Sequence, residues 1–208
     1  MDIEPGNQPG HAYVVCPVCG YKQLFLQLPL LLVTGASGAG KTAVYRYLVH
    51  RVRSAVLLDS DVLWSRAFAQ AEDDYHSYYE TWLSVCKHIG QSGRPVVLFG
   101  AGTGVTSNIE PCMERRFFST LHYLALTCDD EVLSERLRRR PSWRACNSDF
   151  IQKQVEFNQW FKQASASGAP ITLLDTAGIP LETTAGQVRA WIHRTIRSTT
   201  RRNDHQAM

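Results

Sequence analysis

Long hydrophobic runs are missing from this sequence. No apolar stretch comes near the roughly 20 residues that a membrane-spanning helix needs. The first residues, MDIEPGNQPGH, are acidic and rich in Pro and Gly, which is not typical of a secretory signal. Only 6 cysteines occur in 208 residues, and they do not resemble the disulfide framework of a small secreted protein. We therefore expect a cytoplasmic protein in a reducing setting, with no membrane partner.

An excess of charge of one sign is also missing. The formal net charge is only +3, which is too small to indicate nucleic acid as a partner. Positive charge is concentrated in RLRRRPSWR, residues Arg136 to Arg144, and in the C-terminal RTIRSTTRR. Hydrophobic residues make up 44% and charged residues 20%, a balance typical of a globular domain. The length predicts one domain with short appendages.

Apolar runs alternate with helical patterns along the chain. Five such runs read as buried strands, which predicts an α/β fold with a five-stranded parallel sheet and helices on both faces. Ligands of such sheets bind beyond the carboxyl ends of the strands. We expect this domain at 28–198, after a flexible N-terminus with a CPVCG turn at 1–27 and before a polar tail at 199–208. The predicted strands are LPLLLVT, SAVLLDSD, PVVLFGAGTG, LHYLALTC and PITLLDTAG.

The stretch GASGAGKT joins the first predicted strand to a predicted helix. It matches the phosphate-loop pattern G-x-x-x-x-G-K-[ST] in full and in the correct context. Successive backbone N–H groups of such a loop surround a polyphosphate, the lysine reaches the β- and γ-phosphates, and the threonine hydroxyl binds Mg²⁺. The sequence therefore predicts a bound nucleoside triphosphate. The predicted binding residues are Gly35, Ala36, Ser37, Gly38, Ala39, Gly40, Lys41 and Thr42.

Motifs of other triphosphate users are absent. There is no Asn-Lys-x-Asp for guanine, and DTAG at Asp175 lies too late in the chain for the GTPase Asp-x-x-Gly. The third predicted strand ends in glycines rather than in the acid of motor-type ATPases. Acids instead follow the second strand, at Asp59 and Asp61. One carboxylate can serve a cation while the other accepts a proton from an attacking hydroxyl. The structural alternative is that Asp61 caps a helix starting at Val62.

This order of motifs resembles the small-molecule kinases of the P-loop class: shikimate, gluconate and adenylylsulfate kinases and the chloramphenicol phosphotransferases. The resemblance covers about 28–197 and implies a P-loop NTPase fold, with Asp59 near Mg²⁺ and Asp61 facing the acceptor hydroxyl. It also implies an arginine-rich lid at about 138–148, where arginines stabilise the charge of the transferred phosphoryl group. The alternative for these arginines is a solvated helix end. The candidate arginines are Arg136 on the nucleotide, and Arg140 and Arg144 in catalysis.

The same resemblance implies binding roles for two further regions. Thr176 and Gly178, after the last strand, occupy the position that borders adenine. The aromatic segment from Trp64 to Trp82 occupies the acceptor region, although ordinary helix core accounts for most of its rings. In its third-strand loop, GAGTG, the sequence differs from the family. It also contains no motif that is typical of binding shikimate or gluconate.

Cys16 and Cys19 in CPVCG form the turn shape of a zinc ribbon, but a structural zinc needs four ligands. Three interpretations stay open: a zinc site completed by His11, a distant residue or a second chain; a plain turn; or a redox pair.

The leading hypothesis is a kinase that uses ATP and Mg²⁺ to phosphorylate a hydroxyl of a small molecule. The alternative is a nucleotide-binding ATPase or regulator associated with nucleic acid, with a nucleotide or RNA-end kinase between the two.

Overall fold

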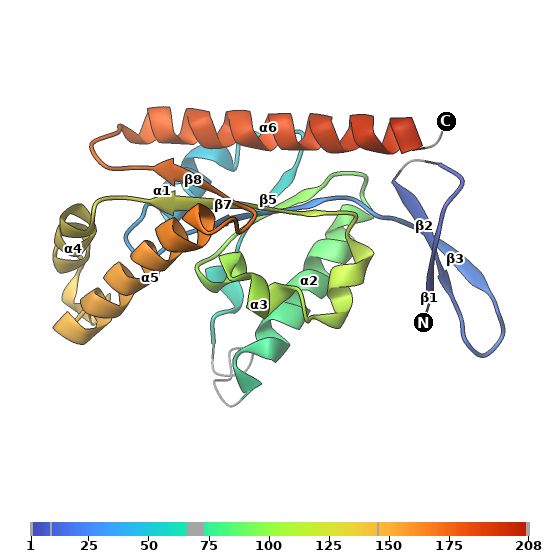
Figure 1. The fold of residues 1–208 in the computed structure, drawn as a ribbon, viewed down its shortest axis with the longest axis horizontal. Coiled ribbons are helices and arrows are strands. Elements are labelled where there is room, and N and C mark those ends of the chain that lie inside the picture. Colours follow the sequence, from blue (N-terminus) through green and yellow to red (C-terminus); the bar gives the residue numbers. More distant parts are fainter. Residues whose placement is uncertain (1, 9, 66–72, 145, 207–208) are drawn as a thin grey trace.

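The main body of the protein is a parallel sheet covered by helices on both faces (Figure 1). The structure is a computed structural model that describes residues 2–8, 10–65, 73–144 and 146–206. The sheet has 5 strands in the order β5-β6-β4-β7-β8, and each neighbouring pair is parallel. This confirms the predicted α/β P-loop fold. The strands are β4 (Leu30–Thr34), β5 (Val56–Asp59), β6 (Val96–Phe99), β7 (Leu121–Thr127) and β8 (Ile171–Asp175).

Two groups of helices bury the two faces of the sheet. Side chains of α1 and α6 share one hydrophobic core with the sheet, and those of α2, α3 and α5 share another. Figure 1 shows α6 above the sheet and α2, α3 and α5 below it. None of the helices in the described ranges is long and apolar enough to cross a membrane. The helices are α1 (Lys41–Leu48), α2 (His76–Gly90), α3 (Thr106–Ile109), α4 (Asp130–Arg138), α5 (Ser148–Ala166) and α6 (Leu181–Gln206).

The central strand β4 fixes the position of the phosphate loop. All of its residues are buried, as expected for a strand covered on both faces. Leu30 and Leu32 join the core under α2, whereas Leu31 and Val33 join the core under α1 and α6. Because side chains alternate along a strand, this continuous apolar run fills both layers at once. The residues after Thr34 therefore leave the middle of the sheet at its carboxyl edge.

The N-terminal segment differs from the predicted flexible one. Residues 1–27 include a three-stranded antiparallel sheet in the order β1-β2-β3. Its buried residues Ala12 and Phe25 pack against Phe117 of the main body, and the rings of Phe25 and Phe117 meet edge to face with centroids 5.4 Å apart. This contact, distant in sequence, gives the sheet an apolar base. The strands are β1 (Asp2–Pro5), β2 (His11–Val15) and β3 (Lys22–Leu26).

Two helix boundaries also differ from the prediction. Helix α6 continues to Gln206, through most of the segment expected to be a polar tail. The sequence pattern from Val62 to Ile89 predicts one helix, but the structure has a 3-10 turn, η1 (Ser60–Leu63), and helix α2, which begins only at His76. Part of that prediction, residues 66–72, lies outside the described residues.

We expect Phe25→Ala to loosen the N-terminal sheet without disturbing the main sheet. The substitution removes an aromatic pair worth about 0.5–1.5 kcal/mol beyond its buried area. Amide hydrogen exchange should therefore accelerate in β2 and β3 and stay unchanged in β4. Leu24→Ala is the matched control, because Leu24 is 52% exposed on the same strand. Equal exchange in both variants would show that the Phe25 contact does not hold this sheet.

Candidate functional site

The phosphate loop lies between β4 and α1 and approaches β7 closely. Gly35 has φ 134°, a conformation that side chains disfavour. A Cβ on Gly35 would lie 2.2 Å from the backbone oxygen of Leu126 on β7. Only glycine fits there, so the motif's first glycine is required by packing against the neighbouring strand. The N–H groups at the start of α1 point toward the loop and favour an anion.

Arg136 and Thr176 form hydrogen bonds with the backbone of the phosphate loop. The Thr176 hydroxyl lies 3.2 Å from the carbonyl oxygen of Ala39 and 3.1 Å from that of Thr127, and it donates to these acceptors. Arg136 donates to the carbonyl of Gly38 at 3.5 Å, and to the hydroxyl and carbonyl oxygens of Thr176 at 3.0 and 2.8 Å. Both residues were expected to contact the nucleotide. Their contacts in the structure are with the backbone of the loop and its support, and their nucleotide contacts stay a prediction.

Gln154 on α5 is a loop contact that the sequence did not indicate. Its side-chain oxygen accepts a hydrogen bond from the backbone N–H of Ser37 at 2.8 Å. This N–H is one of the donors expected to surround a phosphate. No motif marks Gln154, which lies 117 residues away from Ser37 in the chain.

Lys41 folds back over the loop. Its ammonium group donates to the carbonyl oxygens of Gly35 at 2.7 Å and Ala36 at 3.0 Å. Burial lowers the pKa of Lys41 to about 8; the carboxylate of Asp61 opposes this shift and the cation of Arg140 adds to it. Lys41 is therefore close enough to Asp61 and Arg140 for their charges to change its pKa. A polyphosphate in the loop would offer the ammonium group a stronger partner than two neutral carbonyls.

The two acids after β5 have different environments. Asp59 is half-buried, and its Oδ1 accepts a hydrogen bond from the Asp61 N–H at 3.1 Å. Asp59, not Asp61, is thus the capping residue of η1, so the capping role considered for Asp61 is wrong. Burial raises the pKa of Asp59. The hydrogen bond from the Asp61 N–H and the charges of Lys41 and Arg46 oppose this shift, whereas the charge of Asp61 adds to it. Asp61 is exposed, as is Thr42 at the start of α1.

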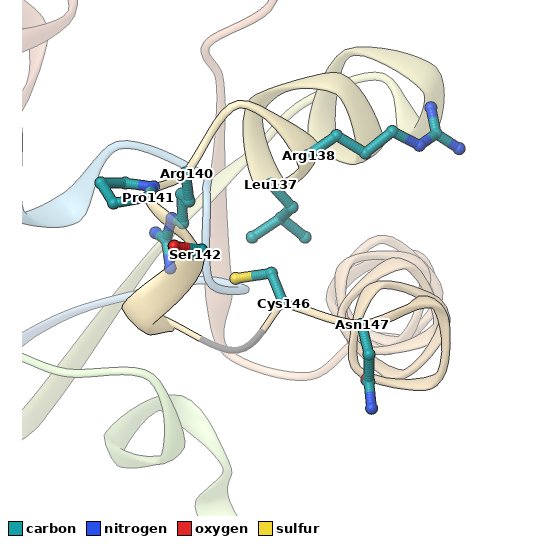
Figure 2. Close-up of a pocket in the computed structure, with 7 residues that line it drawn as sticks. All are labelled: Leu137, Arg138, Arg140, Pro141, Ser142, Cys146 and Asn147. Atoms are coloured by element: carbon teal, nitrogen blue, oxygen red, sulfur yellow. The ribbon is translucent and has the colours of Figure 1, made fainter.

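The predicted lid segment is a turn between α4 and α5. It contains a short 3-10 helix, η5 (Ser142–Arg144). A cavity of about 410 Å³ lies at this turn (Figure 2). In Figure 2, Cys146 points toward Ser142, whereas Arg138 points away from them. The residues lining the cavity are Leu137, Arg138, Arg140, Pro141, Ser142, Cys146 and Asn147.

The lid arginines occupy different places. Arg140 lines the cavity and lies near enough to Lys41 to lower its pKa, so it connects the cavity to the phosphate loop. Arg144 is exposed at the end of η5. Closure of this segment over a nucleotide stays a prediction.

The third-strand loop packs against the end of β4, directly before the phosphate loop. The Thr34 hydroxyl donates to the carbonyl oxygen of Ala101 at 2.6 Å. A Cβ on Gly104 would lie 2.1 Å from the Thr34 side chain. Asn108 donates to the carbonyl oxygen of Gly102 at 3.1 Å and to the hydroxyl of Tyr79 at 3.0 Å. The glycines of GAGTG therefore allow close packing where an ATPase would place an acid.

Most rings of the aromatic segment belong to the core, as the sequence indicated. Tyr78, Tyr79 and Trp82 are buried. Trp64 is 57% exposed, and its ring centroid lies 5.4 Å from those of Tyr75 and Tyr78. Tyr78 donates to the carbonyl oxygen of Ser60 at 2.7 Å, and burial, with a smaller effect of Asp61, raises its pKa. An exposed aromatic face thus lies in the same cluster as the acids.

Cys16 and Cys19 form a tight turn between β2 and β3. The Gly20 N–H donates to the carbonyl oxygen of Cys16 at 2.9 Å. Within the described ranges, no third His, Cys, Asp or Glu is grouped with these two thiols, and the choice between a zinc site, a plain turn and a redox pair stays a prediction. The last predicted loop is also a turn: Asp175 accepts from the Ala177 N–H at 2.9 Å, and Gly178 follows with φ 63°.

We expect ADP binding to weaken as the pH rises above about 8. Lys41, whose pKa is lowered to about 8, is charged below this pH and neutral above it. Losing one proton that the bound state needs weakens affinity by up to ~10-fold per pH unit. Titration calorimetry from pH 7 to 9 measures this change. Lys41→Arg keeps its charge and should bind with little pH dependence; the same decline in that variant would assign the effect to another group.

Comparison with known proteins agrees with this geometry. A sugar kinase from Janibacter sp. HTCC2649 shares 16% identity with a TM-score of 0.60, over 82% of this chain and 97% of that one. A gluconokinase from Sinorhizobium meliloti 1021 shares 18%, with a TM-score of 0.54, over 83% and 95%. The tunicamycin resistance protein of Deinococcus radiodurans shares 18%, with a TM-score of 0.56, over 79% and 95%.

A search of curated proteins finds no match. A sequence-family model described as an AAA domain matches residues 30–166, which include the phosphate loop, both acids and the arginine segment. The chain therefore belongs to this AAA-domain family, and its fold is that of the P-loop kinases that act on small molecules.

Proposed function

We propose that this protein is a kinase that transfers the γ-phosphoryl group of ATP to a hydroxyl of a small molecule. The observation that carries the proposal is the grouping of Lys41, Asp59, Asp61 and Arg140 at the phosphate loop, within reach of one another's charges. Two solved structures of the same fold are a sugar kinase and a gluconokinase, which supports a hydroxyl acceptor.

The residues of the loop suit a nucleoside triphosphate. The loop contains three glycines with positive φ, at Gly35, Gly38 and Gly40, and it ends at the N-terminus of α1, where partial positive charge favours phosphate. Lys41 would leave the carbonyls of Gly35 and Ala36 for the β- and γ-phosphates. Thr42 and Asp59 supply the hydroxyl and carboxylate oxygens that Mg²⁺ prefers. When bound, Mg²⁺ would neutralise charge on the phosphates.

In the transfer step, the acceptor oxygen forms a bond to the γ-phosphorus while the bond from that phosphorus to the β,γ-bridging oxygen breaks. ADP leaves with the electron pair. Asp61, whose carboxylate is exposed, is placed to orient the hydroxyl and take its proton. Arg140 and Arg144 would stabilise negative charge on the group in transfer. Trp64 offers its exposed face to the acceptor next to Asp61.

Asp61→Asn should abolish transfer and leave nucleotide binding intact, because an amide cannot accept the proton. Loss of a general base lowers kcat by about 10²–10⁴-fold. Lys41→Ala should abolish transfer and also weaken ADP binding. Asp149→Asn, at an exposed aspartate in the first turn of α5, is the control.

The assay starts with ATP and a metabolite extract and uses mass spectrometry to find a product that gains one phosphoryl group. Kinetics with that acceptor then compare the variants. Full activity of Asp61→Asn would overturn its assignment. ATP hydrolysis stimulated by nucleic acid, with no phosphorylated metabolite, would favour the alternative ATPase.

Trp64→Ala should raise KM for the acceptor about 10-fold or more while kcat changes little, because burying an aromatic side chain of this kind contributes about 1.5–3 kcal/mol. Leu181→Ala removes an exposed apolar side chain of α6 and is the control. Steady-state kinetics measure both. An unchanged KM for the acceptor would place its binding site away from Trp64.

A further inference from the structure

A second cluster of chemically reactive side chains lies where the start of α2 meets the end of α3. His76 and Glu80 are one turn apart on α2, and Cys112 follows α3. One ligand atom from each of the three residues lies within 4.8 Å of the other two. The described part of the chain contains no other group of this kind. None of the three residues has a role in the proposed phosphoryl transfer.

The spacing of these atoms is close to that of a tetrahedral metal site. Nδ1 of His76 lies 4.0 Å from Sγ of Cys112, and Nε2 of His76 lies 3.7 Å from Oε1 of Glu80. Metal–sulfur and metal–nitrogen bonds of about 2.3 and 2.0–2.1 Å in a tetrahedral zinc site put the ligand atoms roughly 3.5 Å apart. Different ring nitrogens of His76 face the two partners, so binding of one ion would require the ring to turn until a single nitrogen faces both.

The protein holds two of the three ligands in place. Glu80 accepts hydrogen bonds from the backbone N–H groups of Met113 and Glu114, the latter at 3.1 Å. Cys112 is only 4% exposed, and its thiol donates to the carbonyl oxygen of Asn108 at 3.3 Å. The hydrogen bonds to Glu80 are of the kind that orients metal ligands and raises the affinity of a site. Burial holds Cys112 in place, and its bond to Asn108 is given up when the thiol loses its proton to a metal.

The third ligand leaves a way in. The His76 side chain is 51% exposed, so an ion can reach the buried thiol from this side. A water molecule on the same side can supply the fourth ligand, as in zinc sites with three protein ligands.

We propose that His76, Glu80 and Cys112 bind one Zn²⁺ ion. A thiolate, an imidazole and a carboxylate suit a borderline-soft cation, whereas Mg²⁺ prefers oxygen ligands alone. The site is therefore distinct in chemistry from the Mg²⁺ position expected at Thr42 and Asp59. On binding, the Cys112 sulfur bonds to the metal and its proton leaves to solvent.

The ion would fasten the first turn of α2 to the segment after α3. Tyr79 lies in this turn of α2 and Asn108 lies in α3; Asn108 donates to the hydroxyl of Tyr79 and to the carbonyl oxygen of Gly102 in the third-strand loop. Zn²⁺ would thus stiffen the acceptor side of the molecule without contacting nucleotide. This inference does not depend on the proposed kinase activity.

The test uses the full chain, stripped with a chelator and titrated with Zn²⁺ while bound metal and thermal unfolding are measured. We expect one ion per chain and a raised unfolding temperature, and no such effect of Mg²⁺. Co²⁺ in place of Zn²⁺ should give the charge-transfer absorption of a cobalt–thiolate bond. His76→Ala and Cys112→Ala should each weaken Zn²⁺ binding by more than the ~100-fold seen for changes around the ligands.

Two controls make the result specific. His88→Ala removes an exposed histidine from the same helix and should keep the affinity. The double variant Cys16→Ser with Cys19→Ser should keep it too. Because His76 is exposed, the His76→Ala variant should fold. The test therefore does not depend on the Cys112→Ala variant, which changes a buried residue. Unchanged binding in His76→Ala, loss of binding in the Cys16 and Cys19 double variant, or no bound Zn²⁺ in the unaltered protein would each overturn the proposal.

Discussion

The close approach of the phosphate loop to strand β7 is the constraint on which the site depends. With no side chain at Gly35, the loop can pass directly over the backbone oxygen of Leu126. One residue further along β7, the carbonyl oxygen of Thr127 accepts a hydrogen bond from the Thr176 hydroxyl. The same hydroxyl also donates to the carbonyl oxygen of Ala39 in the loop. Strand β8, which pairs with β7, ends next to this threonine. The order of strands in the sheet thus determines the shape of the loop before any ligand binds.

Strand β6, the other neighbour of β4, leads into a glycine-rich loop that packs against the end of β4 and reaches helix α2. Thr34 bonds to Ala101 after β6, and Gly104 packs against its side chain. Asn108 then joins the same loop to Tyr79 of α2. One short glycine-rich segment therefore connects the end of β4 to helix α2. A bulky side chain at Gly104 would clash with Thr34 and push this segment away from β4.

The parallel sheet and the phosphate loop could be predicted from the sequence because their signals are local. A buried run such as Leu30 to Thr34, followed by GASGAGKT, carries its own pattern of burial and backbone freedom. The N-terminal sheet could not be predicted in this way, since Phe25 finds its partner at Phe117, far along the chain. The loop contacts of Arg136 and Gln154 were missed for the same reason. Residues that bond across elements show their partners only once the chain is folded.

The two acids lie in different environments, which suits the two different roles proposed for them. Asp59 is half-buried, and one of its carboxylate oxygens accepts a hydrogen bond from the Asp61 N–H. Lys41 and Arg46 are near enough to lower its pKa. A carboxylate so fixed is better suited to hold a cation than to follow a moving proton. Asp61 extends from the same short turn into solvent, and Asp59 rather than Asp61 caps that turn. The charge of Asp61 is still close enough to Lys41 to raise the pKa of that lysine. Because capping occupies Asp59, the turn leaves the Asp61 carboxylate exposed to solvent, which is the arrangement that the proposed roles of cation binding at Asp59 and proton transfer at Asp61 require.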